Sequence, residues 1–277
     1  MRNKIVFIVA AAAIAASWIG NYAYSRACRL PEAGFLRHYI ETTTVPSVAF
    51  DLLYVANNDD KLKPINVQID ELPELRFYPV YVHQQMHRQT IYVLRGYYDE
   101  NAMTKRKEEA EPLRLHTVRV FYNDGSVKEE NVGEIVVHRE AWPMDPSEDS
   151  LVDMMAGGSS SNGEGWNVIK AKQPVRLTGV SSVWLEKLGD ALQFELKPNP
   201  SAYPMELSKG EMLSLNYTFK PSRQGADALN VYNVQLKMNF EGQSGEKDDY
   251  IVFAHDVPYP SEAEMRAYVR EKRREAE

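Results

Sequence analysis

Two histidines four residues apart, His83 and His87, are the first candidates for chemistry. On a helix this spacing would bring both imidazoles to one face, where they could share a metal ion. The zinc-hydrolase pattern with this spacing has a glutamate directly after the first histidine, and this chain has Gln84 there. A zinc site also needs a third protein ligand with its own supporting contact, and the other histidines are scattered along the chain. We therefore predict no metal site and no cofactor.

Catalysis by a nucleophile has no better support in the sequence. There is no Gly-x-Ser-x-Gly pattern, and the single cysteine, Cys28, comes shortly after an apolar run with no identifiable base beside it. The glycine-rich stretch 157–165 contains no lysine, so it does not match a phosphate-binding loop. His255 and Asp256 are adjacent, and neighbours on a strand point to opposite faces. The sequence thus predicts no catalytic residues.

The segment richest in partner-binding side chains has the pattern of a β-hairpin with a long loop. Arg76–His83 and Thr90–Tyr98 are aromatic and β-branched runs around a polar gap, and Pro79 indicates an edge strand or a bulge in the first run. Tyrosine and arginine are enriched at protein interfaces, and exposed edges recruit other chains. The predicted partner-binding residues are Tyr78, Tyr81, Arg88, Tyr92, Arg95 and Tyr98. The competing interpretation is that these tyrosines are ordinary strand residues packed into the core.

One apolar segment, residues 5–24, is long enough to cross a membrane. Arg2 and Lys4 precede it, and positive charge is retained on the cytoplasmic side, so we expect the remaining chain to be exported. Two interpretations stay open at this point. The segment is either an uncleaved anchor or a signal peptide with Ala23-Tyr24-Ser25 as its small-x-small cleavage site. A buried core helix is the third reading, and the basic start of the chain disfavours it.

Composition narrows the classes of protein further. The chain has 277 residues, of which 44% are hydrophobic and 26% charged, as in ordinary globular proteins. The net charge of −7 disfavours nucleic acid as a partner. A single cysteine excludes an internal disulfide framework, and an exported protein without disulfides fits a bacterial envelope best.

Period-two patterns predict an antiparallel β-protein. Leu213, Leu215, Tyr217 and Phe219 alternate with polar residues, which places them on one face of a strand. Further alternating runs include one through Ile65, Val67 and Ile69. Many short strands with turns between them and almost no helix indicate β-sandwiches. The predicted fold class is all-β, with an N-terminal membrane helix, two antiparallel immunoglobulin-like β-sandwich domains and a short C-terminal helix.

The predicted domain organisation has a boundary where the composition changes. Asp145-Pro146-Ser147-Glu148 resembles a helix start, and the glycine- and serine-rich residues 159–165 indicate flexibility. Ser261 to Glu264 is a capping box for the last helix. The expected units are a signal-anchor or signal peptide (1–25), a first sandwich (26–141), a flexible linker with a short helix (142–165), a second sandwich (166–258) and a charged helix (259–277).

These patterns lead to an expectation about function. We expect a membrane-associated extracytoplasmic protein that binds an envelope protein or a cell-wall component without catalysis. It would be a single-pass protein of the cell membrane, or a secreted one if the signal is cleaved. The alternative is an exported hydrolase whose site is assembled from residues far apart in the sequence.

Overall fold

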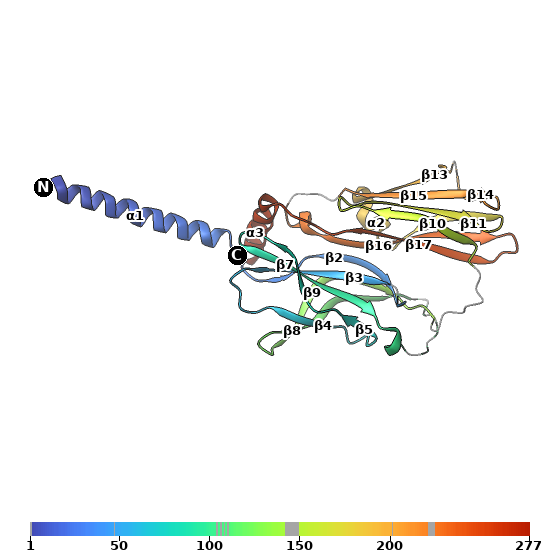
Figure 1. Cartoon of the computed structure of the whole chain (residues 1–277), viewed down its shortest axis with the longest axis horizontal. Coiled ribbons are helices and arrows are strands. Elements are labelled where there is room, and N and C mark those ends of the chain that lie inside the picture. The colour runs from blue at the N-terminus through green and yellow to red at the C-terminus, as the bar shows by residue number, and fades with distance from the viewer. Residues whose placement is uncertain are drawn as a thin grey trace.

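The computed structural model describes residues 2–46, 48–103, 105, 107, 109, 111–141, 150–200, 202–220 and 225–277. The chain is mostly β, with an apolar helix at the N-terminus and a second long helix at the C-terminus (Figure 1). The helices are α1 (Arg2–Ala27), α2 (Leu185–Leu188) and α3 (Glu262–Ala276), and the 3-10 turns are η1 (Glu100–Ala102), η2 (Gly189–Ala191) and η3 (Gly225–Leu229).

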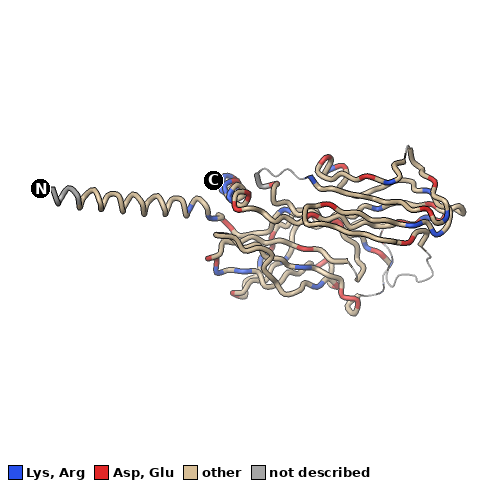
Figure 2. Tube along the Cα trace, turned by 45° about the horizontal axis from the view of Figure 1, so that its top comes forward, with Lys and Arg blue, Asp and Glu red and all other residues tan. Residues whose placement is uncertain are grey.

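Helix α1 projects from the β-rich head as a single rod (Figure 1). Its segment Phe7–Ala27 is long and apolar enough to cross a membrane, and none of it is buried by the rest of the protein. Figure 2 shows uncharged residues along most of α1, with basic residues where it meets the head. The predicted N-terminal apolar helix is therefore confirmed.

Within the described residues the strands form three sheets. The five-stranded sheet contains β1 (Gly34–Phe35), β3 (Ala49–Asn57), β5 (Leu75–Phe77), β6 (Tyr81–Gln85) and β7 (Gln89–Tyr98). The four-stranded sheet contains β10 (Val152–Ser159), β11 (Glu164–Ala171), β13 (Leu192–Lys197) and β15 (Met212–Phe219). The eight-stranded sheet contains β2 (His38–Thr43), β4 (Pro64–Gln68), β8 (Leu113–Tyr122), β9 (Val127–His138), β12 (Val175–Ser181), β14 (Met205–Leu207), β16 (Val231–Gly242) and β17 (Lys247–Asp256).

The eight-stranded sheet runs through both halves of the chain. Strand β2 pairs in parallel with β16 on one side and with β9 on the other, so it joins residues that are about two hundred positions apart. The multiple sheets fit a β-sandwich. One hydrophobic cluster lies between the five-stranded sheet and the N-terminal part of the eight-stranded sheet, and includes Leu52, Leu94 and Val120. The division into two separate domains stays a prediction.

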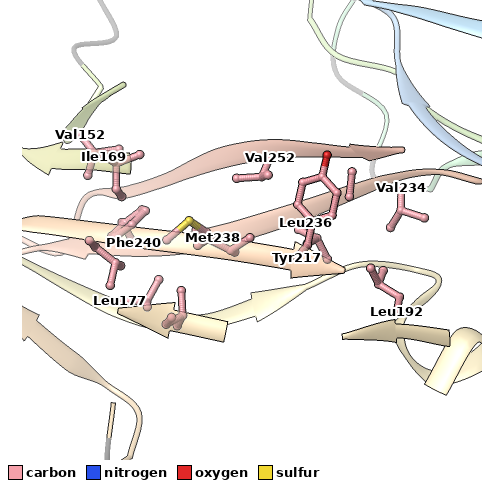
Figure 3. Packing of buried hydrophobic residues seen from close by; sticks show 14 of the residues in the cluster. Val152, Ile169, Leu177, Leu192, Tyr217, Val234, Leu236, Met238, Phe240 and Val252 are labelled. Carbon is pink, nitrogen blue, oxygen red and sulfur yellow. The ribbon is translucent and has the colours of Figure 1, made fainter. Parts of the chain in front are cut away.

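The second cluster packs the four-stranded sheet against the C-terminal part of the eight-stranded sheet (Figure 3). Along β13 and β15 the more deeply buried side chains alternate with more exposed ones, as the sequence predicts. In β15, Leu213, Leu215, Tyr217 and Phe219 are buried, whereas the residues between them are only partly covered. The predicted register of this strand is confirmed.

A third cluster fixes helix α3 to the outer face of the five-stranded sheet. Met265, Tyr268 and Val269 of α3 are buried there against residues such as Leu53 and Ile91. The capping box predicted at the start of this helix is present, with Ser261 and Glu264 exchanging hydrogen bonds.

A buried histidine links two of the sheets. The Nδ1–H of His38 in β2 donates to the Val132 carbonyl at 2.9 Å, and its Nε2 accepts from the Leu53 amide of β3 at 2.8 Å. The side chain is fully buried, and this burial lowers the pKa of His38 from 6.5 to about 4. The imidazole is therefore neutral and satisfies one backbone group in each sheet. Next to it Gly133 has a φ of 98°, and a β-carbon there would overlap the backbone of His38.

Two local predictions were wrong. A bulge between Pro64 and Asn66 breaks the alternation in β4, so Ile65 is 55% exposed while Val67 is buried. In place of a helix and a flexible segment, residues 152–171 form a β-hairpin of β10 and β11.

The glycines and serines that indicated a flexible linker lie in the turn of this hairpin and in the strand ends beside it. Its turn is closed by a 2.8 Å bond from the Ser160 amide to the Glu164 carbonyl, and Gly163 supplies a φ of 78°. Met154 and Met155 are exposed on the edge strand, so they do not form a buried helical face. The proposed helix start at 145–148 lies outside the described residues.

Candidate functional site

A polar cleft lies between the outer face of the five-stranded sheet and the C-terminal end of β17. Two adjoining cavities of about 340 and 420 Å³ share Asp51, Arg95, His255 and Val257 as lining residues. The hairpin turn at Ser159–Ser161 and the side chains of Tyr81 and Tyr259 line the larger one. Strand β3, which carries Asp51, and strand β17, which carries His255, come from opposite ends of the chain and meet at this cleft.

An ion pair forms the centre of the cleft. Asp51 of β3 and Arg95 of β7 are directly opposite in the antiparallel ladder, so their side chains point to the same face. The guanidinium donates from Nε and Nη2 to the two carboxylate oxygens at 2.6 and 2.7 Å. Hydrogen bonding to Asp51 raises the pKa of Arg95 further above its ordinary value. The pair fixes the guanidinium plane and leaves Arg95 47% exposed.

Aromatic side chains form one rim of the cleft. Tyr81 of β6 is 42% exposed, and partial burial raises its pKa, so the phenol stays neutral. Tyr78 is 50% exposed and stacks on Tyr97 with their ring centroids 4.3 Å apart. Tyr97 and Arg95 are two residues apart on β7 and share a face. The rim thus consists of large, rigid side chains beside a fixed cation.

The opposite rim, which carries Tyr259, is attached to β6 by hydrogen bonds. His83 Nε2 donates to the Pro258 carbonyl at 3.2 Å, and its ring lies 4.1 Å from the ring of Tyr259. Partial burial lowers the pKa of His83, which favours the neutral imidazole. Gln84 Nε2 donates to the Pro260 carbonyl at 2.9 Å. These contacts hold the exposed ring of Tyr259 in place at the cleft mouth.

The structure brings together three of the six predicted partner-binding residues. Tyr78, Tyr81 and Arg95 belong to the cleft and its rim. Arg88 lies at the end of α1, where it donates to Ser25 Oγ at 2.9 Å. This places it in a different region of the head.

The other two predicted residues face the opposite side of the sheet. Tyr98 is only 2% exposed and belongs to the core, so its prediction as a partner contact was wrong. Tyr92 is half-buried and packs against the same cluster, with Lys63 over its ring. Even-numbered residues of β7 face this core, whereas Arg95 and Tyr97 face the cleft.

Sequence reasoning missed the residues that complete the cleft. Asp51, His255, Asp256, Tyr259 and the turn Ser159–Ser161 line it. No local pattern marks them, because they meet only through the pairing of β16 with β2 and the packing of the connector between β17 and α3 against β6. The only sequence signal for the cleft was the aromatic and arginine content of one strand pair, β6 and β7.

His83 and His87, the first candidates for chemistry, do not form a metal-binding pair. His83 belongs to strand β6, and His87 lies in the turn after it, where its amide donates to Glu262 Oε1 at 2.8 Å. Within the described ranges, no three His, Cys, Asp or Glu side chains are arranged to hold a metal ion.

A serine, a glutamate and a histidine do meet elsewhere in the head. Ser182 Oγ donates to Glu41 Oε2 at 2.5 Å, and His138 Nε2 lies 2.9 Å from Glu41 Oε1. In a nucleophilic triad the imidazole stands between the hydroxyl and the carboxylate, where it takes the hydroxyl proton. Here the carboxylate stands between the other two groups and is 1% exposed. This arrangement ties β2 to β9 and to the loop after β12.

No protein-family model and no curated protein matches the sequence. A search of solved structures found similarity to a protein of unknown function from Porphyromonas gingivalis W83. The two chains are 15% identical, with a TM-score of 0.25, and the match covers 82% of this chain and 96% of that one. A likeness at this level assigns neither a family nor a function.

Proposed function

We propose that this protein is anchored in the cell membrane by α1 and binds an envelope protein in the polar cleft without catalysis. Its head would consist of two immunoglobulin-like β-sandwich units that share the eight-stranded sheet. The observation that carries the proposal is the aromatic rim beside the Asp51–Arg95 pair.

The composition of the cleft supports protein binding. Tyr78, Tyr81 and Tyr259 are 50%, 42% and 62% exposed, although large aromatic side chains are usually more deeply covered. Tyrosine and arginine supply much of the binding energy at interfaces, because they bury large areas with little loss of side-chain freedom. Arg95 is already oriented by Asp51, which reduces the ordering cost of pairing with a partner's acceptor.

Contacts at the base of α1 support retention of the anchor. Arg88 donates to Ser25 Oγ at 2.9 Å and lies over the ring of Tyr24, and Gln89 Nε2 donates to the Cys28 carbonyl at 2.9 Å. The last turn of α1 is therefore part of the head rather than a linker. Cleavage after Ser25 would remove part of this packing.

The chain directly after α1 is held equally firmly. The Leu30 amide donates to Asn57 Oδ1 at 2.9 Å, and Arg29 bridges Asp59 and Asp60 at 2.7 and 2.9 Å. The head thus sits on the end of α1 without a flexible spacer, which would hold the cleft at a set height above a bilayer.

Removing the exposed tyrosines is expected to weaken partner binding without unfolding the head. In Tyr78→Ala with Tyr81→Ala, we expect chemical crosslinking of the full chain to its envelope partner to fall about tenfold or more, since interface tyrosines often contribute over ~1 kcal/mol each. Circular dichroism should stay unchanged. Tyr203→Ala is the matched control, because Tyr203 is 46% exposed and does not line the cleft.

Two results would contradict the binding proposal. Equal crosslinking by the tyrosine variant and the control would place the partner elsewhere. Unfolding of the tyrosine variant would show that these side chains stabilise the fold. The hydrolase alternative would need convergent catalytic groups, and no observation in the described residues favours it over binding.

Export of the head is expected from Arg2 and Lys4, the basic residues before the apolar segment Phe7–Ala27. The natural cysteine is replaced in Cys28→Ser, and a new one is introduced by Ser244→Cys in the exposed turn between β16 and β17. A membrane-impermeant maleimide should label this variant in intact spheroplasts, whereas Cys28→Ser alone should stay unlabelled. Labelling that requires permeabilised cells would place the head in the cytoplasm.

A further inference from the structure

Helix α3 carries its arginines along one face. Arg266, Arg270 and Arg274 recur every four residues and are exposed, so they form a continuous stripe that we call the arginine stripe. None of the three has an acidic partner among the described residues. The apolar residues Met265, Tyr268 and Val269 occupy another face and are buried in the third cluster. The helix is therefore fixed in rotation, and the three arginines of the stripe point away from its buried face.

The helix lies at the end of the head from which α1 emerges. Figures 1 and 2 show α3 beside the head end of α1 in both views, with basic residues concentrated along it in Figure 2. Arg273 donates to the Arg26 carbonyl at the last turn of α1. Arg273 is seven residues, or two turns, after Arg266, so Arg266 at the start of the stripe lies on the side of α3 that reaches α1.

We propose that the arginine stripe binds the phosphate groups of anionic phospholipids at the bilayer surface from which α1 emerges. This proposal rests on the membrane anchoring of the proposed function and assigns a second surface to the head. Because the candidate membrane-spanning segment of α1 is Phe7–Ala27, the Arg26 carbonyl marks the boundary between hydrocarbon and headgroups. Side chains on the face of α3 that contacts Arg26 are then within reach of the lipid phosphates.

Helix α3 carries five basic and four acidic residues, so the placement of the three arginines on one face matters here more than net charge. The whole chain carries −7, which would repel an acidic membrane. Screening in physiological salt limits exposed charges to a range of about 8 Å, so only residues near the bilayer count. Guanidinium groups bind phosphate oxygens through paired hydrogen bonds, which makes arginine well suited to this contact. Lipid contact by the stripe would set the tilt of the head, together with α1, relative to the bilayer.

The test uses the full chain in nanodiscs of phosphatidylcholine, with and without phosphatidylglycerol. A fluorophore on Ala276→Cys in a Cys28→Ser background reports quenching by a lipid that carries a quencher on its headgroup. We expect quenching to increase with the phosphatidylglycerol fraction and to fall at high salt. Arg266→Gln with Arg270→Gln and Arg274→Gln should lower the equilibrium constant for the lipid-bound orientation about fivefold per arginine, or about a hundredfold together.

A matched control removes equal charge elsewhere. Lys172→Gln with Lys209→Gln and Lys247→Gln changes three exposed cations outside α3 and should leave the quenching unchanged. Quenching that does not depend on phosphatidylglycerol, or that survives in the arginine variant, would overturn the proposal and leave an acidic protein as the occupant. A chain that does not co-purify with nanodiscs would contradict the anchoring itself, and the lipid proposal with it.

Discussion

Leu215→Asp is expected to destabilise the head by about 5 kcal/mol, a large fraction of the total stability of an ordinary domain. Leu215 is fully buried between the four-stranded and eight-stranded sheets, in the same cluster as Leu236 and Met238. The change removes a packed aliphatic group and places a carboxylate where no partner can reach it. Urea denaturation of the full chain in a neutral detergent should show the loss as a lower transition midpoint.

The matched control uses the neighbouring residue on the other face. Asn216 is only partly covered and lies opposite Glu195 in the ladder, so Asn216→Asp should cost less than about 1 kcal/mol through mild like-charge repulsion. Equal losses in the two variants would mean that the register of β15 is inverted or that both of its faces are buried.

His38→Ala is expected to cost about 4 kcal/mol. The change leaves the Leu53 amide and the Val132 carbonyl buried without partners, each at about 1–3 kcal/mol, and opens a cavity between two sheets. His87→Ala, which alters an exposed turn histidine, should change the stability by less than about 0.5 kcal/mol. A small loss in His38→Ala would show that water or a neighbouring group replaces the bridge.

The same histidine predicts a dependence of stability on pH. Its pKa is about 4 in the folded protein and 6.5 as a free side chain, so the folded state favours the neutral form. Its contribution is fully present above pH 6.5 and is lost as the pH falls toward 4, by about 3 kcal/mol in all. The difference in unfolding free energy between wild type and His38→Gln should shrink by this amount over that range, since glutamine does not titrate.

Local patterns predicted the strands with a buried and a solvated face, because each such strand carries its own periodic signal. The run of β15 and the capping box of α3 are examples. Local signals failed where pairing decides the structure. The glycines and serines of 159–165 indicated flexibility, yet the pairing of β10 with β11 makes them the turn of a hairpin and the strand ends beside it.

For the same reason, only part of the candidate site could be predicted from the sequence. Tyr78, Tyr81 and Arg95 lie on one hairpin, whose composition could be read directly. Which tyrosines face outward depends on the register of β7, and this places Tyr98 in the core. Asp51 and Tyr259 join the cleft only through tertiary pairing, for which a single sequence holds no signal.

Site-specific photocrosslinking from the cleft is the sharpest test of partner binding. A photoreactive phenylalanine analogue would replace Tyr81 in the full chain within its native membrane, and the same analogue at Tyr203 would serve as the control. Both positions are exposed to a similar degree, at 42% and 46%. If the cleft binds a partner, we expect a discrete crosslinked protein from position 81 that is absent from position 203. Adducts of equal yield at both positions, or none from position 81, would contradict partner binding in the cleft.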